Sequence, residues 1–517
     1  MLLKQTIYIA LLTLTAACVV EARAQCATAT DALKVADNWL NVIVSREGHW
    51  AGTTTPNIRD LTVVERDGLL LGYCAAVAPQ GFVFVSPWTD FAPVKAFSWT
   101  SDLDPSGPGG LPVLLKDVQA RRAQFLIRRF GGLDDTSLQP LRKLTPDSNR
   151  DAWSVLLLPA AERQMEQQGL GENGYHVGPL MYGIRWYQSA PFNAQCPHDN
   201  CPNDPLGRTR VGCVPLAMAM VMQHFCWPPH WQGELYDWPN TFNHEAIYAG
   251  SGYNFENEDG RLWTTAEINA VADLCADAGD AVDANYGCDS TGAHVCAWYD
   301  TDVRNAMRTL HYSDGSIDTP ECEDRPEYTA SDWFNIIRIE IDYNRPVVYR
   351  IRSNSGSLSH SVVVDGYGEW SGQCWLHANY GWGINNHTTW YVLDHLDCDR
   401  SAAHEDCDLD DEKLVRWIYP KTAIDSSFSG TLGPRTSPTD LHHYIYYDVA
   451  IDTTVAEAGA WIQLLPGASL TCNSGTVEIR GGTPNTKVFS QDRQMRGIDI
   501  GTGGKMLLHP AGQVRIH

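Results

Sequence analysis

The apolar positions along this chain follow helical spacing in some stretches and strand spacing in others. Helical spacing covers residues 32–44 and 214–225. Short apolar runs bounded by turn residues are typical of strands, and they lie at residues 69–77, 81–86, 93–98, 346–351, 360–365 and 390–393. After residue 424, such runs alternate with turns to the end of the chain. The pattern therefore predicts helices and sheets together, in an α+β protein.

The order of these patterns divides the chain into five parts. Residues 1–24 form an apolar leader, and residues 25–125 form a small α+β module of one helix and antiparallel strands. Residues 126–174 are a charged linker with a candidate processing site. Residues 175–423 are rich in aromatic residues and glycine, and their early helix and late strands favour two lobes with a cleft between them. Residues 424–517 form an all-β module, which we expect to serve attachment or sorting.

The C-terminal module contains one repeated phrase. Leu-Leu-Pro-Gly at residues 464–467 recurs with insertions at residues 507–512, about 43 residues later. A repetition at a fixed distance indicates a repeat architecture. We therefore expect a degenerate β-repeat in this module.

The leader has the three zones of a secretory signal peptide. Lys4 supplies a positive start, residues 7–20 an apolar core, and Ala22-Arg23-Ala24 a cleavage site with small residues at both ends. Cleavage there leaves Gln25 first, and lipoprotein processing at Cys18 is the alternative. No later apolar run reaches the ~18–20 residues of a membrane-spanning helix. We expect export to the cell surface or the extracellular medium, without a membrane span.

Charge and cysteine content narrow the function classes. The formal net charge of −24 gives no support for binding to nucleic acid or to anionic membranes. The 15 cysteines fit an oxidising compartment. Candidate disulfides are Cys196 with Cys201, Cys398 with Cys407, Cys26 with Cys74, and pairs among Cys275, Cys288, Cys296 and Cys322. Zinc is not expected, because the chain has no two paired CxxC units.

Cys213 lies where the second helical stretch begins. Proline fits only the first turn of a helix, so Pro215 places the helix start within a residue or two of Cys213. A thiol at that end faces unpaired backbone N–H groups and the positive end of the helix dipole, which lowers its pKa and favours the nucleophilic thiolate. The competing interpretation is a buried or disulfide-bonded cysteine. A catalytic Cys213 therefore needs a base and an oxyanion donor elsewhere in the chain.

Three other residues supply the groups that a thiolate nucleophile requires. His360 opens an apolar strand 147 residues after Cys213, and Asn379 lies 19 residues further on. Two paired strands would bring His360 and Asn379 side by side, so that the amide meets one ring nitrogen and the other faces the thiol. His377 is a competing base, but it lies on the same strand as Asn379. Gln188, 25 residues before Cys213, can join the Cys213 N–H in binding an oxyanion.

The segments around these residues resemble the streptopain/interpain family of secreted bacterial cysteine peptidases. The matching segments are 188–197, 212–214, 360–367 and 377–383, with weaker matches at 288–293 and, in the N-terminal module, at Trp39, Gly72-Tyr73 and 81–86. The resemblance implies a papain-like, two-lobed peptidase over residues 175–423. It also implies that residues 25–125 are an inhibitory propeptide, which blocks the cleft until it is cut away between about Arg142 and Gly174.

The family's roles carry over onto the matching positions. They imply Cys213 as nucleophile, His360 as acid and base, Gln188 as oxyanion donor, Asn379 as the group that orients the imidazole, and Trp382 as a shield against water. The residues implied to line the substrate cleft are Ser290, Thr291, Gly292 and Ala293. The implied partners are protein or peptide substrates and the chain's own propeptide, and no cofactor or metal is implied.

The sequence departs from the family pattern at three places and leaves two other functions open. Pro215-Leu216 replaces small residues, Tyr380 stands where tryptophan is common, and Ile384 replaces a glycine. None of these removes a catalytic group, but the last two can reshape the cleft wall. The alternatives are an inactive peptidase fold used for adhesion and another Cys-His acyl transferase, such as a transglutaminase or amidase.

Overall fold

The computed structural model describes most of residues 26–419 and, from residue 430 onward, only the strands. Within 26–419, the residues outside the description are 108–109, 135, 160–174, 182, 203, 229, 242–244, 251–253, 289–298, 313–319, 353–358, 384–387 and 394–410. The expected leader, residues 1–24, also lies outside the described residues.

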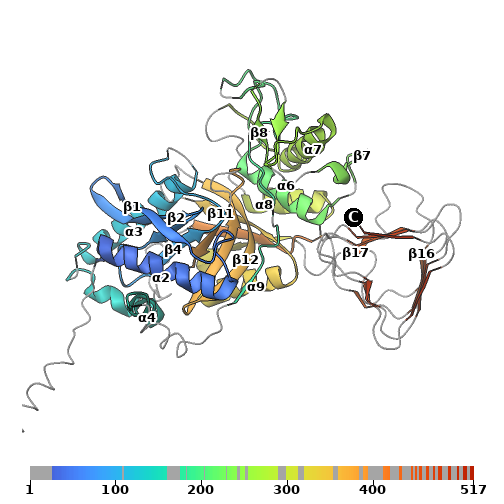
Figure 1. Ribbon diagram of the computed structural model, residues 1–517. Helices are drawn as coiled ribbons and strands as arrows, with labels where there is room; N and C mark the ends of the chain where they lie inside the picture. The colour runs from blue at the N-terminus through green and yellow to red at the C-terminus, as the bar shows by residue number, and fades with distance from the viewer. Residues whose placement is uncertain are drawn as a thin grey trace, which may run out of the picture.

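One antiparallel sheet of eleven described strands runs through the main body of the molecule (Figure 1). Its strands, from one edge to the other, are β1 (Asn57–Arg66), β2 (Leu69–Ala78), β3 (Phe82–Val85), β4 (Val94–Ser98), β14 (Thr388–Val392), β13 (Gln373–Asn379), β12 (Ser359–Trp370), β11 (Val347–Arg352), β15 (Asp411–Arg416) and β10 (Glu321–Asp324). The short strand β5 (Tyr175–Val177) pairs with the end of β12. The helices and strands expected from the sequence over these stretches are confirmed.

The helices cover both faces of this sheet (Figure 1). They are α2 (Ala29–Glu47), α3 (Leu111–Phe130), α4 (Asp147–Leu156), α6 (Cys213–Phe225), α7 (Thr265–Ala281), α8 (Tyr299–Thr309) and α9 (Ala330–Asp342), with 3-10 turns η1 (Gln139–Lys143), η2 (Trp238–Asn240) and η3 (Arg325–Glu327). Two small hairpins, β6 (His230–Trp231) with β7 (Glu234–Leu235) and β8 (Ile247–Tyr248) with β9 (Phe255–Glu256), lie beside the α6–α7 part.

Alternation along β11 and β12 divides the hydrophobic core into two sides. Val348 and Val363 face the cluster built around α6, α7 and α8. Their neighbours Val347 and Val362 face the opposite cluster, which α3 and α9 cover. Successive side chains of a strand point to opposite faces of the sheet, so this division also decides which residues can reach Cys213.

The N-terminal module and the later sheet are continuous through backbone pairing. On β4, Phe97 pairs with Trp390 of β14 and Ala96 pairs with Tyr391. Helix α2 covers one face of this junction, where Trp39 lies 5.1 Å from Trp375 between ring centroids. The two parts therefore share one sheet and one aromatic core, although 292 residues separate Ser98 from Trp390.

Local sequence signals explain where the helices of this body begin and how closely they pack. Helix α2 begins with a capping box, in which Thr28 and Asp31 bond each other's backbone N–H groups. Gly381 has a φ of +64° and lies against α6, so that a Cβ there would be 2.6 Å from Leu216 Cδ2. Glycine is therefore required at position 381 both by the left-handed backbone and by the approach of α6.

The strands after residue 430 form three parallel sheets of their own. Their orders are β16 (Gly430–Leu432), β19 (Thr453–Ala456), β22 (Thr476–Ile479) and β25 (Lys505–Leu508); β17 (Tyr444–Ile445), β20 (Trp461–Leu464), β23 (Lys487–Ser490) and β26 (Gln513–Ile516); and β18 (Val449–Ala450), β21 (Leu470–Thr471) and β24 (Ile498–Asp499). They outline a triangle at the right of Figure 1, as expected for a parallel β-solenoid.

The solenoid confirms the expected all-β module but corrects its repeat. Paired strands start 23 residues apart in β19 and β22, 26 residues apart in β20 and β23, and 29 residues apart in β22 and β25. The two Leu-Leu phrases begin on Leu464 of β20 and Leu507 of β25, which belong to different sheets. The 43-residue spacing is therefore not the structural repeat, because the two phrases lie on strands that do not pair with each other.

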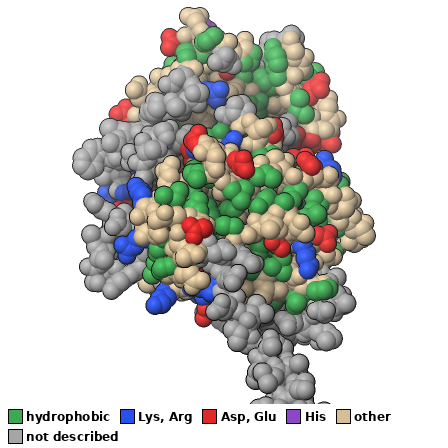
Figure 2. All heavy atoms as spheres, turned by 90° about the vertical axis from the view of Figure 1, so that its left-hand side faces the viewer, with side chains coloured by type: hydrophobic (Ala, Val, Ile, Leu, Met, Phe, Trp, Pro, Cys, Tyr) green, Lys and Arg blue, Asp and Glu red, His purple; other side chains and the backbone are tan. Residues whose placement is uncertain are grey.

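The surface of the N-terminal side is mixed in character. Figure 2 shows apolar side chains gathered in the middle of this face, with acidic and basic side chains among and around them. In the part of the chain that the structure describes, none of the helices has both the length and the apolar character needed to cross a bilayer.

Candidate active site

Cys213 is the first residue of the central helix of the α6 cluster. Gly212 precedes it with a φ of +92°, and every residue from Val214 to Phe225 is buried. Cys213 itself is partly buried and forms no disulfide. The helix start expected from Pro215 is confirmed, and the thiol lies at the N-terminus of a helix that the core holds on all sides.

The pKa of the Cys213 thiol is raised, which corrects the direction expected from its place on the helix. Burial is the largest cause and disfavours the thiolate. Hydrogen bonds from Ser361, through both its backbone N–H and its hydroxyl, and from the N–H groups of Cys213 and Val214 act in the opposite direction. The helix N-terminus thus acts as expected, but desolvation outweighs it in this state of the chain.

His360 directly precedes Ser361 on β12 but turns its ring to the other side of the strand. Its Nε2–H donates to the carbonyl oxygen of Tyr380 at 2.8 Å. Its ring stacks on Trp382 at 4.2 Å between centroids. Burial lowers the pKa of His360 to about 4, so the imidazole is neutral at pH 7.

Among the described residues, the structure gives His360 no hydrogen bond to Cys213. A carbonyl only accepts, so the proton of the neutral ring lies on Nε2 and leaves Nδ1 unprotonated. Cys213 thus contacts Ser361, the strand neighbour of His360, while the His360 ring bonds Tyr380 and stacks on Trp382.

Asn379 holds the turn that presents Tyr380 to His360. Its Oδ1 accepts from the Gly381 N–H at 3.0 Å, and its Nδ2 donates to the Ile184 carbonyl at 2.8 Å. Asn379 pairs with Val363 across β12 and β13. The expected strand pairing is confirmed, while the hydrogen-bond partner of the imidazole is the backbone one residue beyond Asn379.

The segment of Gln188 contacts the backbone just before Cys213. Its carbonyl oxygen accepts from the N–H of Val211, two residues before Cys213, at 3.0 Å. The preceding residue, Tyr187, forms an isolated bridge with Trp382. The chain segments of Gln188, Cys213 and Trp382 therefore meet at one place, as an oxyanion site requires.

His377, the competing base, is engaged in the sheet. Its Nδ1–H donates to Asp365 Oδ1 at 2.6 Å, and both side chains are buried. The other oxygen of Asp365 accepts from the Met181 N–H at 2.9 Å. The His377–Asp365 pair thus ties β13 to β12 and to the segment that precedes Gln188.

The cysteines pair differently from the sequence expectation. Cys201 forms a disulfide with Cys288, 87 residues later. Cys74, Cys196 and Cys275 are free thiols, so the expected pairs Cys26–Cys74 and Cys196–Cys201 do not form. Proximity in sequence does not decide the pairing, because the loop after Gln188 folds against the segment that follows α7.

Several predicted positions lie outside the described residues. They are the candidate cleft residues Ser290, Thr291, Gly292 and Ala293, the departure Ile384, and the candidate pairs involving Cys296, Cys398 and Cys407.

Comparison with known proteins shows what this part of the chain is similar to. Residues 186–391, which hold Gln188, Cys213, His360 and Asn379, match the model of the Peptidase C10 family. This part of the chain is similar to C10 peptidases. The resemblance to the streptopain/interpain family stated from the motifs is confirmed.

Two curated proteins are similar to this chain in sequence. The thiol protease/hemagglutinin PrtT of Porphyromonas gingivalis is 30% identical over 229 residues, which cover 43% of this chain and 24% of that protein. Streptopain of Streptococcus pyogenes is 28% identical over 221 residues, which cover 39% of this chain and 51% of that protein. The chain therefore spans about a quarter and about half of the length of these relatives.

Two solved structures from Prevotella intermedia also align with the chain. Prointerpain A aligns with 70% of this chain and 100% of its own, at 18% identity and a TM-score of 0.44. Active interpain A aligns with 47% of this chain and 95% of its own, at 25% identity and a TM-score of 0.34.

Two contacts of the candidate site could not be expected from motifs alone. The Tyr380 carbonyl is a backbone group, which no side-chain motif indicates. For Ser361, the signal is a polar residue between His360 and the apolar run Val362-Val363-Val364 of a buried strand. A hydroxyl in that place faces the side of the strand opposite to His360.

Proposed function

We propose that this chain is a secreted cysteine endopeptidase made as a zymogen, which hydrolyses protein substrates through an acyl-thioester. One observation carries the proposal. Within the segment that matches the Peptidase C10 family, the unpaired Cys213 at a helix N-terminus contacts the residue next to His360.

The mechanism uses the groups around the sulfur in sequence. His360 first takes the proton of the Cys213 thiol, which leaves a thiolate and an imidazolium. The thiolate attacks the scissile carbonyl carbon, and the resulting oxyanion accepts hydrogen bonds from the Cys213 N–H and the Gln188 amide. The His360 imidazolium protonates the leaving amine and becomes neutral. His360 then removes a proton from water, which attacks the acyl-thioester and releases the acid and the thiolate. Asn379 and Trp382 position the ring during both steps.

The position of His360 supports latency of the full-length chain. The segment that enters α3 passes against Trp382, since a Cβ on Gly110 would lie 3.5 Å from its Cε3. Trp382 in turn stacks on His360. Residues of the N-terminal module thus lie against the indole on which His360 stacks, and we propose that their removal frees His360 to turn toward Cys213.

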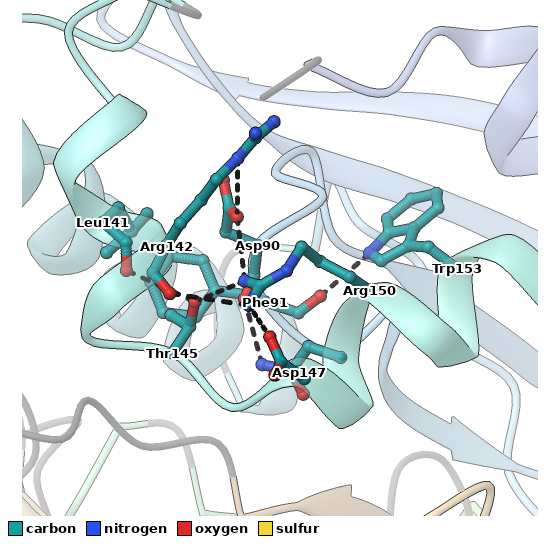
Figure 3. A network of polar contacts seen from close by, with 9 residues as sticks. Asp90, Phe91, Leu141, Arg142, Thr145, Asp147, Arg150 and Trp153 are labelled. Carbon is teal, nitrogen blue, oxygen red and sulfur yellow. Dashed lines mark hydrogen bonds and ion pairs between the residues drawn. The ribbon is translucent and has the colours of Figure 1, made fainter. Parts of the chain in front are cut away.

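The contacts of η1 and α4 limit where the proposed processing site can lie. Buried Asp90 Oδ1 accepts from Arg150 at 3.2 Å and lies 3.8 Å from Arg142 Nε (Figure 3). On α4, Trp153 donates to the Phe91 carbonyl at 2.8 Å. These contacts anchor η1 and α4 on the N-terminal module. We therefore propose that the propeptide extends to about Leu158 and that the cut falls between Pro159 and Gly174.

Peptide hydrolysis by processed protein tests the proposed function. We expect the processed chain to cleave denatured protein substrates, to lose that activity to iodoacetamide, and to lose it by at least about 10³-fold in Cys213→Ala. Full-length Cys213→Ala, unable to process itself, serves as substrate for wild-type protein, and N-terminal sequencing of the product locates the cut.

Four outcomes would contradict parts of this proposal. Hydrolysis that survives Cys213→Ala would assign the chemistry to another residue. Processed protein without hydrolysis would favour the adhesion alternative, and transfer of amines to glutamine side chains would favour the acyl transferase. A cut before Leu156 would contradict the propeptide boundary alone.

A further inference from the structure

Ser361 contacts the Cys213 sulfur from the strand that carries His360. Its backbone N–H and its hydroxyl both hydrogen-bond the sulfur. Ser361 is 3% exposed and pairs with Arg350 across β11 and β12, so the sheet fixes its position. The contact is therefore part of a buried and regularly paired strand and not of a loop.

The alternation of β12 separates the surroundings of Ser361 from those of His360. Ser361 shares its side with Val363, which lies in the α6 cluster. His360 shares the other side with Val362, in the cluster that also contains Tyr380. Ser361 thus bonds the sulfur in the full-length chain. The proposed function requires the ring of His360, the residue before it, to turn toward the same sulfur.

We propose that Ser361 is a positioning residue of this peptidase, which holds the Cys213 sulfur at the N-terminus of α6 and donates its hydroxyl hydrogen bond to the thiolate. The inference rests on the proposed function for its catalytic meaning, but the contact itself does not. In the full-length chain, Ser361 is a side-chain donor to the sulfur while His360 is engaged with Tyr380.

The physical effect of such a donor is on the charged form of the thiol. A hydrogen bond given to a thiolate favours that form, and here it opposes the burial that disfavours it. A hydroxyl that merely filled space at position 361 would leave the ionisation of Cys213 unchanged. The titration of the sulfur therefore distinguishes positioning from packing.

Alkylation of Cys213 by iodoacetamide measures that titration without any peptide substrate. The rate at Cys213 is followed by mass spectrometry from pH 5 to 10 in full-length and processed protein. We expect Ser361→Ala to raise the midpoint by roughly 0.5–1 pH unit, and so to lower the rate at pH 7 roughly three- to tenfold. Ser361→Thr, which keeps the hydroxyl, is expected to stay near the wild-type profile.

Thr241→Val is the matched control for loss of a buried hydroxyl. Thr241 is buried in the same domain and donates to the Trp238 carbonyl at 2.8 Å, away from Cys213. We expect its alkylation profile to coincide with that of the wild type. In processed Ser361→Ala, the acidic limb of kcat/KM should move up by the same amount while KM is retained.

The results separate this inference from the proposed function. Coinciding profiles for Ser361→Ala and the wild type would overturn the role of Ser361 even if hydrolysis is normal. A shift in Ser361→Ala that Thr241→Val reproduces would overturn it as well. If the alkylation profiles of Ser361→Ala and the wild type differ but the processed protein hydrolyses no peptide, the positioning role of Ser361 would be supported and the proposed peptidase function would be refuted.

Discussion

His360 is a neutral imidazole stacked on Trp382 in the full-length chain. Burial lowers its pKa to about 4, while its bond to Tyr380 acts in the other direction. An unfolded histidine titrates near a pKa of about 6.5. Between these two values the unfolded chain binds more protons than the folded chain. The contribution of His360 to stability is therefore complete above about pH 6.5 and is lost as the pH falls toward 4.

We expect acid to destabilise the latent chain through His360 by at most about 3 kcal/mol over this window. Urea unfolding of full-length Cys213→Ala, which prevents self-processing, measures the free energy of unfolding at pH 7 and at pH 4.5. Adding His360→Asn should reduce the difference between the two pH values. Equal differences with and without His360→Asn would refute the buried neutral imidazole.

The members of the candidate site could be predicted from the sequence, but their present state could not. Pro215 fixes the helix start, and strand spacing brings His360 and Asn379 to adjacent strands. The pKa of Cys213 depends on how deeply the whole chain buries the sulfur, and local residue types do not encode that depth. The rotation of His360 depends on the Tyr380 carbonyl and on contacts to Trp382 from a distant segment.

At the scale of elements, local pattern was sufficient for helices and strands but not for their partners. The runs around Phe84, Val348 and Trp390 became strands where period and residue type indicated them. The pairing of β4 with β14 joins residues almost three hundred positions apart and leaves no local mark. The disulfide between Cys201 and Cys288 also leaves no local mark, since the packing of two distant loops determines which sulfurs approach each other.

The disulfide between Cys201 and Cys288 pins the loop that links Gln188 to Cys213. Because it closes a long loop, we expect the double variant Cys201→Ser/Cys288→Ser to lose about 2–4 kcal/mol in free energy of unfolding. Chemical denaturation of the full-length chain measures this loss. Cys26→Ser, which removes an exposed thiol outside this bridge, should change little. A double variant as stable as Cys26→Ser would show that the bridge does not contribute.

At the scale of the whole molecule, the solenoid and the peptidase body pair their described strands separately. We expect a chain ending at residue 423 to remain latent and, once processed, to hydrolyse peptides within about twofold of the full chain. A chain ending at residue 410 should unfold, because it lacks β15, which lies between β11 and β10. Activity assays and circular dichroism of both truncations measure these outcomes. Loss of activity on removal of residues 424–517 would contradict the separation.

The shared sheet at β4 and β14 would give the proposed maturation an optical signature. Trp370, Trp375 and Trp390 are now sealed from solvent by Phe97 and Trp39. Departure of residues 25–158 would expose these indoles to solvent, shift their fluorescence emission to longer wavelength and make them accessible to quenching by acrylamide. The cut could then be followed in real time without a substrate. Loss of β4 would also leave one edge of β14 unpaired, and an unpaired strand edge favours association with a second copy of the chain.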